Sequence, residues 1–141
     1  MTRGAARFPT DAARSDLMRR VRQRGTKPEG EVASILRELK LRFRCNVRKL
    51  PGSPDFANQR RRWAIFVNGC FWHRHDGCVR TTTPTRNRQF WLAKFESNKK
   101  RDKDKMELLR AMNFVVLTVW ECETDNRPLV RRRLKGLTRL G

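Results

Sequence analysis

The sequence predicts an α/β domain in which helices cover a mixed β-sheet. Apolar residues at helical spacing alternate along the chain with short apolar runs bounded by polar turns, in the order helix, strands, helix, strand, helix. The length of 141 residues suits one domain with one core. No internal repeat interrupts the order. We therefore expect a single domain over 1–141, with a basic arm at 1–25 and a folded core at 26–141.

The first strong element is a helix that begins near Thr26. Thr26 can serve as the N-cap, Pro28 is tolerated in the first turn, and Glu29 stands three residues after the cap. The apolar face of this helix consists of Val32, Ile35, Leu36 and Leu39. Before it, a short apolar stripe within 15–23 predicts one or two helical turns in the arm.

Three apolar segments predict the first strands of the sheet. Residues 41–47 alternate apolar and polar side chains, which predicts a half-buried strand with Cys45 as a small core residue. Residues 55–69 read as two strands joined by a polar turn at 58–62. The nearly continuous apolar run 63–67 suits a strand at the centre of the sheet.

The second half of the chain predicts two further helices around one strand. Residues 86–112 are helical in composition and begin with the aromatic residues Phe90, Trp91 and Phe95. Residues 114–120, FVVLTVW, form the clearest buried strand. Residues 127–137 then predict a basic helix that closes the domain.

The chain carries a large excess of positive charge. It has 34 Lys and Arg residues against 14 Asp and Glu, a net charge of +20. Such a charge opposes compaction unless a polyanion screens it, which favours nucleic acid as the partner. No apolar run is long enough to span a bilayer, and the N-terminus lacks lipidation and secretory signals. We therefore expect a cytoplasmic protein that binds no membrane.

A cluster of metal-binding side chains follows the strand at 63–67. Cys70, His73, His75 and Cys78 fall within nine residues and include both histidines of the chain. In a reducing cytosol, cysteines more often bind metal than form disulfides, and Zn²⁺ prefers four tetrahedral thiolate and imidazole ligands. The spacing therefore predicts a structural zinc site.

The spacing leaves two sets of zinc ligands open. Cys122 follows the strand 114–120 as Cys70 follows the run 63–67, so both reach one sheet edge if these strands are parallel neighbours. The first set is Cys70, His75, Cys78 and Cys122. The second set takes both histidines with Cys70 and Cys78, and leaves Cys122 as a buried thiol.

Asp55 is a candidate ligand for a catalytic metal. Phosphodiester hydrolysis needs a cation to neutralise the phosphate and a base to activate water. Pro54 and Asp55, at the start of a strand, match the first half of the Pro-Asp…Asp/Glu-x-Lys nuclease signature. The next strand, residues 64–69, supplies neither the acid nor the lysine of the second half.

Four motifs in one order resemble the very-short-patch-repair (Vsr) mismatch endonucleases. These motifs are PGSPDF, IFVNGCFWHRH, FW within 86–97, and VWEC, and the likeness runs from about Ser15 to Cys122. The resemblance implies a restriction-endonuclease-like fold. It also implies a bacterial, nucleoid-associated enzyme that makes a Mg²⁺-dependent nick in double-stranded DNA. The nick would lie 5′ of the thymine in a T·G mismatch, the lesion left by deamination of 5-methylcytosine.

The resemblance implies a role for each candidate site residue. Asp55 would bind Mg²⁺ with the backbone carbonyl of Val67, and His73 would be the general base, since imidazole titrates near neutral pH. The zinc ligands would be Cys70, His75, Cys78 and Cys122. One residue more than the family pattern lies between His75 and Cys78, so the loop must bulge there.

Two acidic residues and two departures from the family pattern complete this expectation. Glu29 and Asp102 match acidic positions that could hold metal-bound waters, although a helix-capping residue and a solvated charge run would explain them as well. Val67 stands where the best-known relative has threonine, and Asn68 replaces a histidine to which the resemblance gives a role in assisting the phosphate. Either departure could reduce the rate or alter the metal preference.

Aromatic residues are the expected mismatch contacts. Phe71, Trp72 and Trp91 match family aromatics that insert beside the mismatch, where apolar wedges exploit an easily opened base step. For Trp91, four residues before Phe95, a core position is the alternative. Met18 and Arg19 in the arm match a segment that lies across the DNA.

Two other functions compete with mismatch nicking. A sequence-specific restriction-type nuclease would cut both strands of perfectly paired DNA. A non-catalytic zinc-containing nucleic-acid binder would use the same charge, zinc and aromatic residues. The chain shows no obvious seam for self-association, so we expect a monomer, with downstream repair proteins as possible partners.

Overall fold

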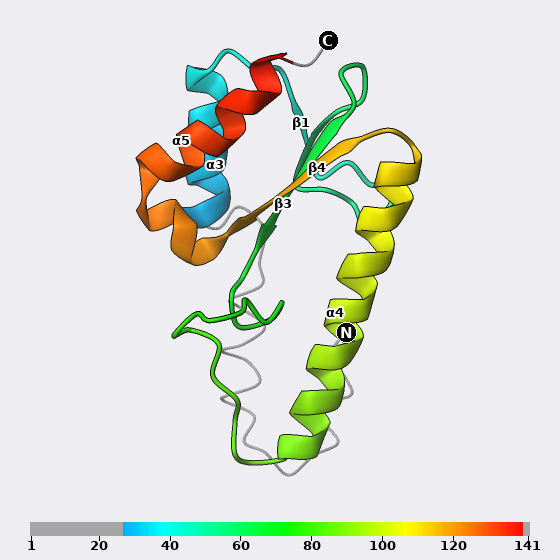
Figure 1. Ribbon diagram of the computed structural model, residues 1–141, viewed down its shortest axis with the longest axis vertical. Helices are drawn as coiled ribbons and strands as arrows, with labels where there is room; N and C mark the ends of the chain where they lie inside the picture. Colours follow the sequence, from blue (N-terminus) through cyan, green and yellow to red (C-terminus); the bar gives the residue numbers. More distant parts are fainter. Residues whose placement is uncertain (1–26, 140–141) are drawn as a thin grey trace.

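A mixed four-stranded sheet forms the centre of the computed structural model, which describes residues 27–139 (Figure 1). The strands are β1 (Arg44–Cys45), β2 (Phe56–Asn58), β3 (Trp63–Asn68) and β4 (Val115–Trp120), in that spatial order. β2 pairs antiparallel with both β1 and β3, whereas β3 and β4 are parallel. The predicted α/β class with a mixed sheet is confirmed.

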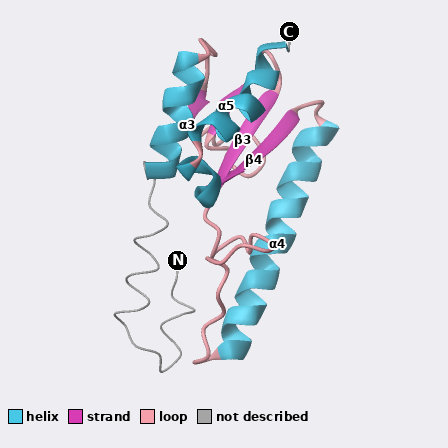
Figure 2. Cartoon of the chain, turned by 60° about the vertical axis from the view of Figure 1, so that its left-hand side comes forward, coloured by secondary structure: helices cyan, strands magenta, loops and turns pink. Residues whose placement is uncertain are grey.

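Helices cover both faces of the sheet. α3 (Lys27–Glu38) and α5 (Arg127–Lys135) lie side by side against one face, and α4 (Arg88–Ala111) runs along the other (Figures 1 and 2). Short 3-10 helices, η1 (Glu121–Asp125) and η2 (Gly136–Arg139), flank α5. α4 is longer than the strands, so its first turns extend past the sheet beside the loop that follows β3.

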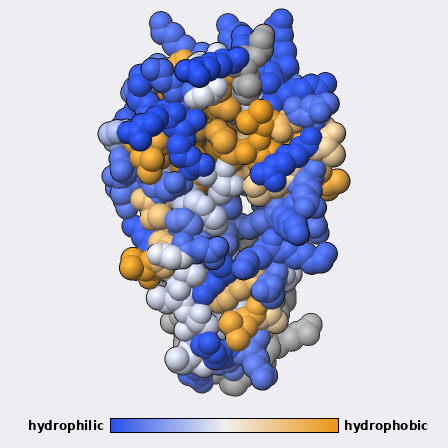
Figure 3. Space-filling view, viewed as in Figure 1, coloured by the Kyte–Doolittle hydropathy of each residue, from blue (hydrophilic) through white to orange (hydrophobic). Residues whose placement is uncertain are grey.

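The apolar run of β3 is explained by burial on both faces. Trp63 and Ile65 pack with α3 and α5, whereas Ala64 and Phe66 pack with Leu109 on the α4 side. Successive side chains of a strand point to opposite faces, so a strand covered on both sides alternates between two cores rather than between core and solvent. Apolar residues gather between the two helical layers in the face shown in Figure 3, and hydrophilic ones cover most of the rest.

Ion pairs and a capping contact fix α5 against α3. Arg127 contacts Glu31 at 3.1 Å and Glu38 at 2.9 Å, and Arg131 contacts Glu38 at 2.7 Å. At the N-terminus of α5, the Asn126 side chain accepts a hydrogen bond from the Leu129 backbone N–H. The ion pairs are solvent-exposed and each contributes little, so the apolar contact beneath them supplies most of the stability.

The strand predicted over 41–47 is shorter than expected, and the core position of Cys45 was wrong. β1 contains only Arg44 and Cys45, and both side chains are exposed. Asn46 has a φ of 49°, so the left-handed backbone there ends the alternation before Val47, which is buried. The thiol of Cys45 therefore faces solvent at the sheet edge.

The predicted arm, with Met18 and Arg19, lies outside the described residues, as does the N-cap position Thr26. None of the described helices combines the length and the apolar character that crossing a bilayer requires. The predicted helices over 86–112 and 127–137 correspond to α4 and to α5 with the start of η2.

Leu134→Ala is expected to lower the free energy of unfolding by about 2–5 kcal/mol. Leu134 of α5 is fully buried in the core between the sheet and the helices α3 and α5, so truncation loses apolar burial and leaves a cavity. Urea unfolding measures the change. Leu108→Ala, at a side chain that is 57% exposed on α4, should change it by less than about 0.5 kcal/mol. Equal effects of the two variants would contradict this packing.

Candidate active site and metal centre

The candidate residues meet where β3 and β4 end and β2 begins. β3 and β4 are parallel, and Asn68 pairs with Trp120 at their carboxyl ends. β2 is antiparallel to β3, so its first residues lie at the same edge. This topology brings the residue before β2, the loop after β3 and the turn after β4 to one side of the sheet.

Asp55 reaches from the start of β2 towards β3. Its Oδ2 accepts a hydrogen bond of 2.7 Å from the Val67 backbone N–H. Burial raises the pKa of Asp55 to about 6, and the Val67 hydrogen bond opposes that rise only in part. The negative charge of Glu29 raises this pKa further, while Lys105 and His73 lower it. These charges therefore act on one another across a single centre.

His73 is held by a carboxylate of α4. Its Nδ1 lies 2.5 Å from Asp102 Oδ2, and the other carboxylate oxygen, Oδ1, lies 3.1 Å from Lys105 Nζ. Burial would raise the pKa of Asp102, but the hydrogen bond with His73 and the charge of Lys105 together hold it below its usual value. An ionised Asp102 carboxylate can only accept a hydrogen bond, so Nδ1 of His73 carries the proton and donates it. Nε2 is then the unprotonated nitrogen of the imidazole.

Four sequence-predicted residues are linked by electrostatic interactions or by contact, and we call them, with Lys105 added, the Asp55 centre: Asp55, Glu29, His73 and Asp102. A solvated charge run does not describe Asp102, because its side chain is only 16% exposed and contacts His73. Sequence reasoning missed Lys105. The signal was available, since helical residues three apart are neighbours and Lys105 follows Asp102 by three.

A second group, the cysteine cluster, contains Cys70, His75, Cys78 and Cys122. Their ligand atoms all lie within 4.8 Å of one another, so the four residues could hold a metal ion. His75 Nδ1 is 3.6 Å from Cys70 Sγ and 3.4 Å from Cys122 Sγ. Tetrahedral zinc, with Zn–S of about 2.3 Å and Zn–N of about 2.0 Å, would place sulfur and nitrogen about 3.5 Å apart. The donor atoms and their spacing fit this ion.

The cluster is built from the two strand ends and a looped segment. Cys70 follows β3, and Cys122 lies in η1 directly after β4. The His75 ring stacks on Trp120 with centroids 4.3 Å apart, and the His75 carbonyl accepts a 2.7 Å hydrogen bond from Thr81 Oγ1. Of the two histidines, the structure brings only His75 into the cysteine cluster.

The three thiols of the cysteine cluster lie in different electrostatic environments. Burial raises the pKa of the Cys70 thiol to about 12 and raises the pKa of Cys122, whereas a backbone hydrogen bond at Arg80 lowers the pKa of Cys78. A buried thiolate is costly without a compensating charge, and a metal cation supplies that charge while it displaces the proton. Gly77, at a φ of 72°, allows the turn between His75 and Cys78.

Aromatic residues form a third group, the aromatic cluster, beyond the end of the sheet. Trp72, Trp91 and Phe95 are 8%, 3% and 4% exposed, and Phe71 packs against them half-buried. The long helix α4 extends past the sheet here, so the loop must cover its apolar side. The expectation that Trp72 is open for insertion does not match this burial, and Trp91 takes the core position given as its alternative. Phe71 keeps part of its surface exposed.

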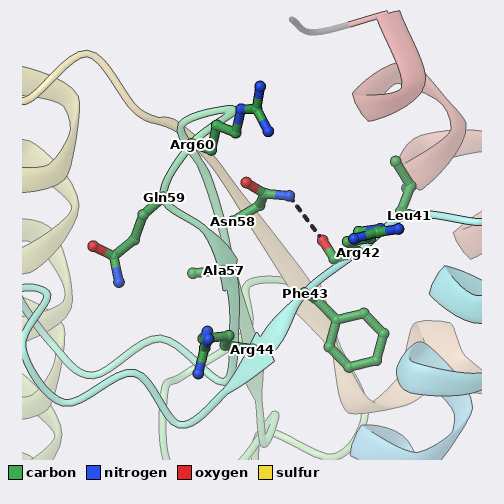
Figure 4. A pocket seen from close by; sticks show the side chains of 8 residues that line it. All are labelled: Leu41, Arg42, Phe43, Arg44, Ala57, Asn58, Gln59 and Arg60. Atoms are coloured by element: carbon green, nitrogen blue, oxygen red, sulfur yellow. Dashed lines mark hydrogen bonds between the residues drawn. The ribbon is translucent and has the colours of Figure 1, made fainter.

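A groove of about 610 Å³ lies along the β1 edge, away from these clusters (Figure 4). It is lined by Leu41, Arg42, Phe43, Arg44, Ala57, Asn58, Gln59 and Arg60. The Asn58 amide donates a 3.0 Å hydrogen bond to the Arg42 carbonyl across its floor. None of these lining residues is acidic, so the groove offers guanidinium and amide donors to anions.

The chain is similar to a family of DNA endonucleases and to several of its relatives. Residues 8–80 match the family described as DNA mismatch endonuclease Vsr. The chain is 39% identical over 121 residues to the type II nicking enzyme V.XorIIP of Xanthomonas oryzae, covering 86% of this chain and 88% of that protein. It is 35% identical over 130 residues to the type II nicking enzyme V.NmeAIP of Neisseria meningitidis, covering 92% of both. It is 40% identical over 116 residues to the DNA mismatch endonuclease Vsr of Escherichia coli, covering 82% and 74%.

Asp55→Asn is expected to stabilise the protein above pH 6 in buffer without added divalent metal. The pKa of Asp55 is raised to about 6 in the folded protein, so folding favours the protonated carboxyl. The free energy of unfolding therefore falls as the pH rises through that value and Asp55 ionises. The amide avoids this loss, which amounts to up to about 3 kcal/mol at pH 8 and nearly zero below pH 4. Urea unfolding at three pH values measures it.

The matched control is Asp104→Asn, at a carboxylate of α4 that is 56% exposed. It should show no comparable gain at pH 8. If Asp55→Asn and the parent protein have equal stability at pH 8, the burial assigned to this carboxylate is wrong.

Proposed function

The chain belongs to the DNA mismatch endonuclease Vsr family, and on this premise we propose that it is an Mg²⁺-dependent DNA endonuclease that nicks one strand beside a T·G mismatch. The nick lies 5′ of the mispaired thymine and begins very-short-patch repair of deaminated 5-methylcytosine. The observation that supports the proposal is that Asp55 precedes β2 at the sheet edge where the loop carrying the His73–Asp102 pair leaves β3, and that the charge of His73 acts on the pKa of Asp55.

In this mechanism His73 takes the proton of the attacking water. His73 Nδ1–H donates to Oδ2 of ionised Asp102, with 2.5 Å between the nitrogen and the oxygen, so Nε2 carries the free electron pair that accepts the water proton. The contact also fixes the plane of the ring. Asp102 therefore acts as a positioning residue for the base, a role more specific than the holding of metal-bound water expected from the sequence.

Asp55 and the backbone carbonyl of Val67 are the proposed ligands of Mg²⁺. Both offer oxygen atoms, the donor that this ion prefers, and the Asp55 carboxylate is already tied to the Val67 peptide group. When bound, Mg²⁺ supplies the positive charge that neutralises the phosphate. Glu29 lies within electrostatic reach of Asp55 and is proposed to hold metal-bound waters. Use of a backbone oxygen tolerates valine at position 67.

Cys70, His75, Cys78 and Cys122 are the proposed ligands of a structural Zn²⁺. Four protein ligands leave no open position for substrate, which is typical of a structural site. His73 lies two residues before His75, so the ion would fix the loop that carries the base. In this proposal His75 binds only the zinc and His73 serves only as the base.

DNA binding is assigned to the positive charge, to Phe71 and to the arm. The arm over 1–25, with Met18 and Arg19, is proposed to lie across the duplex, and the domain is proposed to be a monomeric, restriction-endonuclease-like unit in the bacterial nucleoid. Phe71 is the candidate wedge because it keeps exposed surface. Trp72 and Trp91 are proposed to support it from beneath, since ring centroids of Phe71 and Trp72 lie 5.3 Å apart.

Nicking is favoured over the two competing functions. Two relatives are named nicking enzymes, which supports cutting of one strand over the double-strand cutting of a restriction-type nuclease. A non-catalytic binder would have no use for a half-buried His–Asp pair beside a buried carboxylate. The catalytic proposal accounts for both.

The activity is tested on oligonucleotide duplexes that differ only in a T·G or T·A pair. With Mg²⁺, the protein should nick the T·G duplex in one strand, and Asp55→Ala and His73→Ala should each lower the rate by about 10²–10⁴-fold, because the cation site or the base is lost. Asp104→Ala, at an exposed carboxylate, is the matched control. Equal cutting of both strands of the T·A duplex would instead indicate the restriction-type function, and no cleavage of either duplex the binding function.

Zinc content and stability test the cysteine cluster. The purified protein should carry about one zinc per chain, and Cys122→Ser should lower both the zinc content and the melting temperature, because a structural ion contributes folding energy. Cys45→Ser removes an exposed thiol outside the cluster and should change neither. Retention of one full equivalent of zinc by Cys122→Ser would contradict this ligand set.

A further inference from the structure

Lys105 is a lysine of α4 that points into the protein. Its side chain is 20% exposed, whereas that of Lys100 on the same helix is 78% exposed. Lys105 Nζ lies 3.1 Å from Asp102 Oδ1 and 4.3 Å from the centroid of the Phe66 ring on β3. Lysine side chains normally keep their charge in water and lose conformational entropy when fixed, so this placement needs compensating contacts.

Gly52 makes room for the aliphatic part of Lys105. A Cβ atom at Gly52 would lie 2.4 Å from Lys105 Cδ and 2.8 Å from its Cβ, closer than such atoms approach. Gly52 also has a φ of 75°, a left-handed conformation that favours glycine. The turn that contains Gly52 leads into Asp55, so the lysine packs directly on the segment that presents the proposed metal ligand.

Lys105 and His73 contact different oxygens of the Asp102 carboxylate. His73 contacts Oδ2 and Lys105 contacts Oδ1, so both oxygens are occupied and rotation of the carboxylate is restricted. Lys105 is also the cation of α4 that acts on Asp55, where Glu29 adds further negative charge. A phosphate anion has to approach these carboxylates, and a fixed ammonium group offsets part of their repulsion.

We propose that Lys105 is a positioning residue of the nuclease centre, which fixes the Asp102 carboxylate and through it the His73 imidazole. This inference rests on the proposed function. β3 carries no lysine, and the ammonium group that contacts Asp102 and acts electrostatically on Asp55 comes from α4 instead. A misplacement of a catalytic group by about 1 Å can cost about 10²-fold in rate, so loss of the Lys105 contact acts mainly on kcat.

The test compares Lys105→Met, Lys105→Gln and Lys105→Arg in the T·G nicking assay with Mg²⁺. Both neutral variants should lower kcat by about 10–100-fold with KM within about threefold, and Lys105→Arg should recover part of the loss because it keeps a cation near Asp102. The matched control is Lys103→Met, which removes an exposed positive charge from the same helix and should keep kcat. Melting temperatures of all variants establish that the fold is intact.

A double-mutant cycle tests whether Lys105 acts through Asp102. Asp102→Asn should slow nicking, and adding Lys105→Met to it should cost little more, because the contact is already lost. Fully additive losses would overturn the positioning role. The positioning role would also be overturned if Lys105→Met and Lys105→Gln had the same kcat as the control Lys103→Met.

Metal binding gives a readout that does not depend on nicking. Calorimetric titration with Mn²⁺ of the zinc-loaded protein should show Lys105→Met binding at least as tightly as the parent, because a positive charge near Asp55 has been removed. Clearly weaker binding would indicate general damage to the centre and overturn the proposal. If the parent protein nicks no duplex, the proposed function fails, whereas an active parent with unaffected Lys105 variants overturns this inference alone.

Discussion

The parallel pairing of β3 and β4 is the constraint on which the rest of the structure depends. It brings Cys70 and Cys122 from distant parts of the chain to one edge of the sheet, the edge at which the loop that carries His73 begins. Asp55 meets that edge because β2 runs antiparallel to β3. A shift of register between the two parallel strands would therefore separate Cys70 from Cys122.

Two histidines only two residues apart serve two environments. His75 lies within reach of three sulfurs and stacks on Trp120, whereas His73 turns towards α4 and Asp102. Arg74, between them, has a φ of 54°, and this left-handed turn directs the two imidazoles apart. The loop thus directs one imidazole to the cysteine cluster and the other to Asp102.

The sequence predicted what local patterns and spacing determine. The helix before residue 40 and the apolar run of β3 followed from periodicity and order. The meeting of Cys70 and Cys122 at one sheet edge was expected only on the condition that their strands are parallel neighbours, and the structure meets that condition. Contacts that depend on the third dimension did not follow. The exposure of Cys45 results from the backbone turn at Asn46, and the burial of Trp72 results from the length of α4 beyond the sheet. The burial of Lys105 could not be predicted, because it lies in a charged run whose other residues are mostly exposed.

Nitrogen NMR of the two imidazole rings tests the central claim most directly, since the chain contains only two histidines. In the zinc-loaded protein, one ring should show a metal-bound Nδ1, and the other a protonated Nδ1 with a free Nε2; His73→Gln should remove only the second pattern. That result would place His75 on the metal and His73 on Asp102. Two metal-bound rings, or a His73 ring protonated at Nε2, would contradict the account.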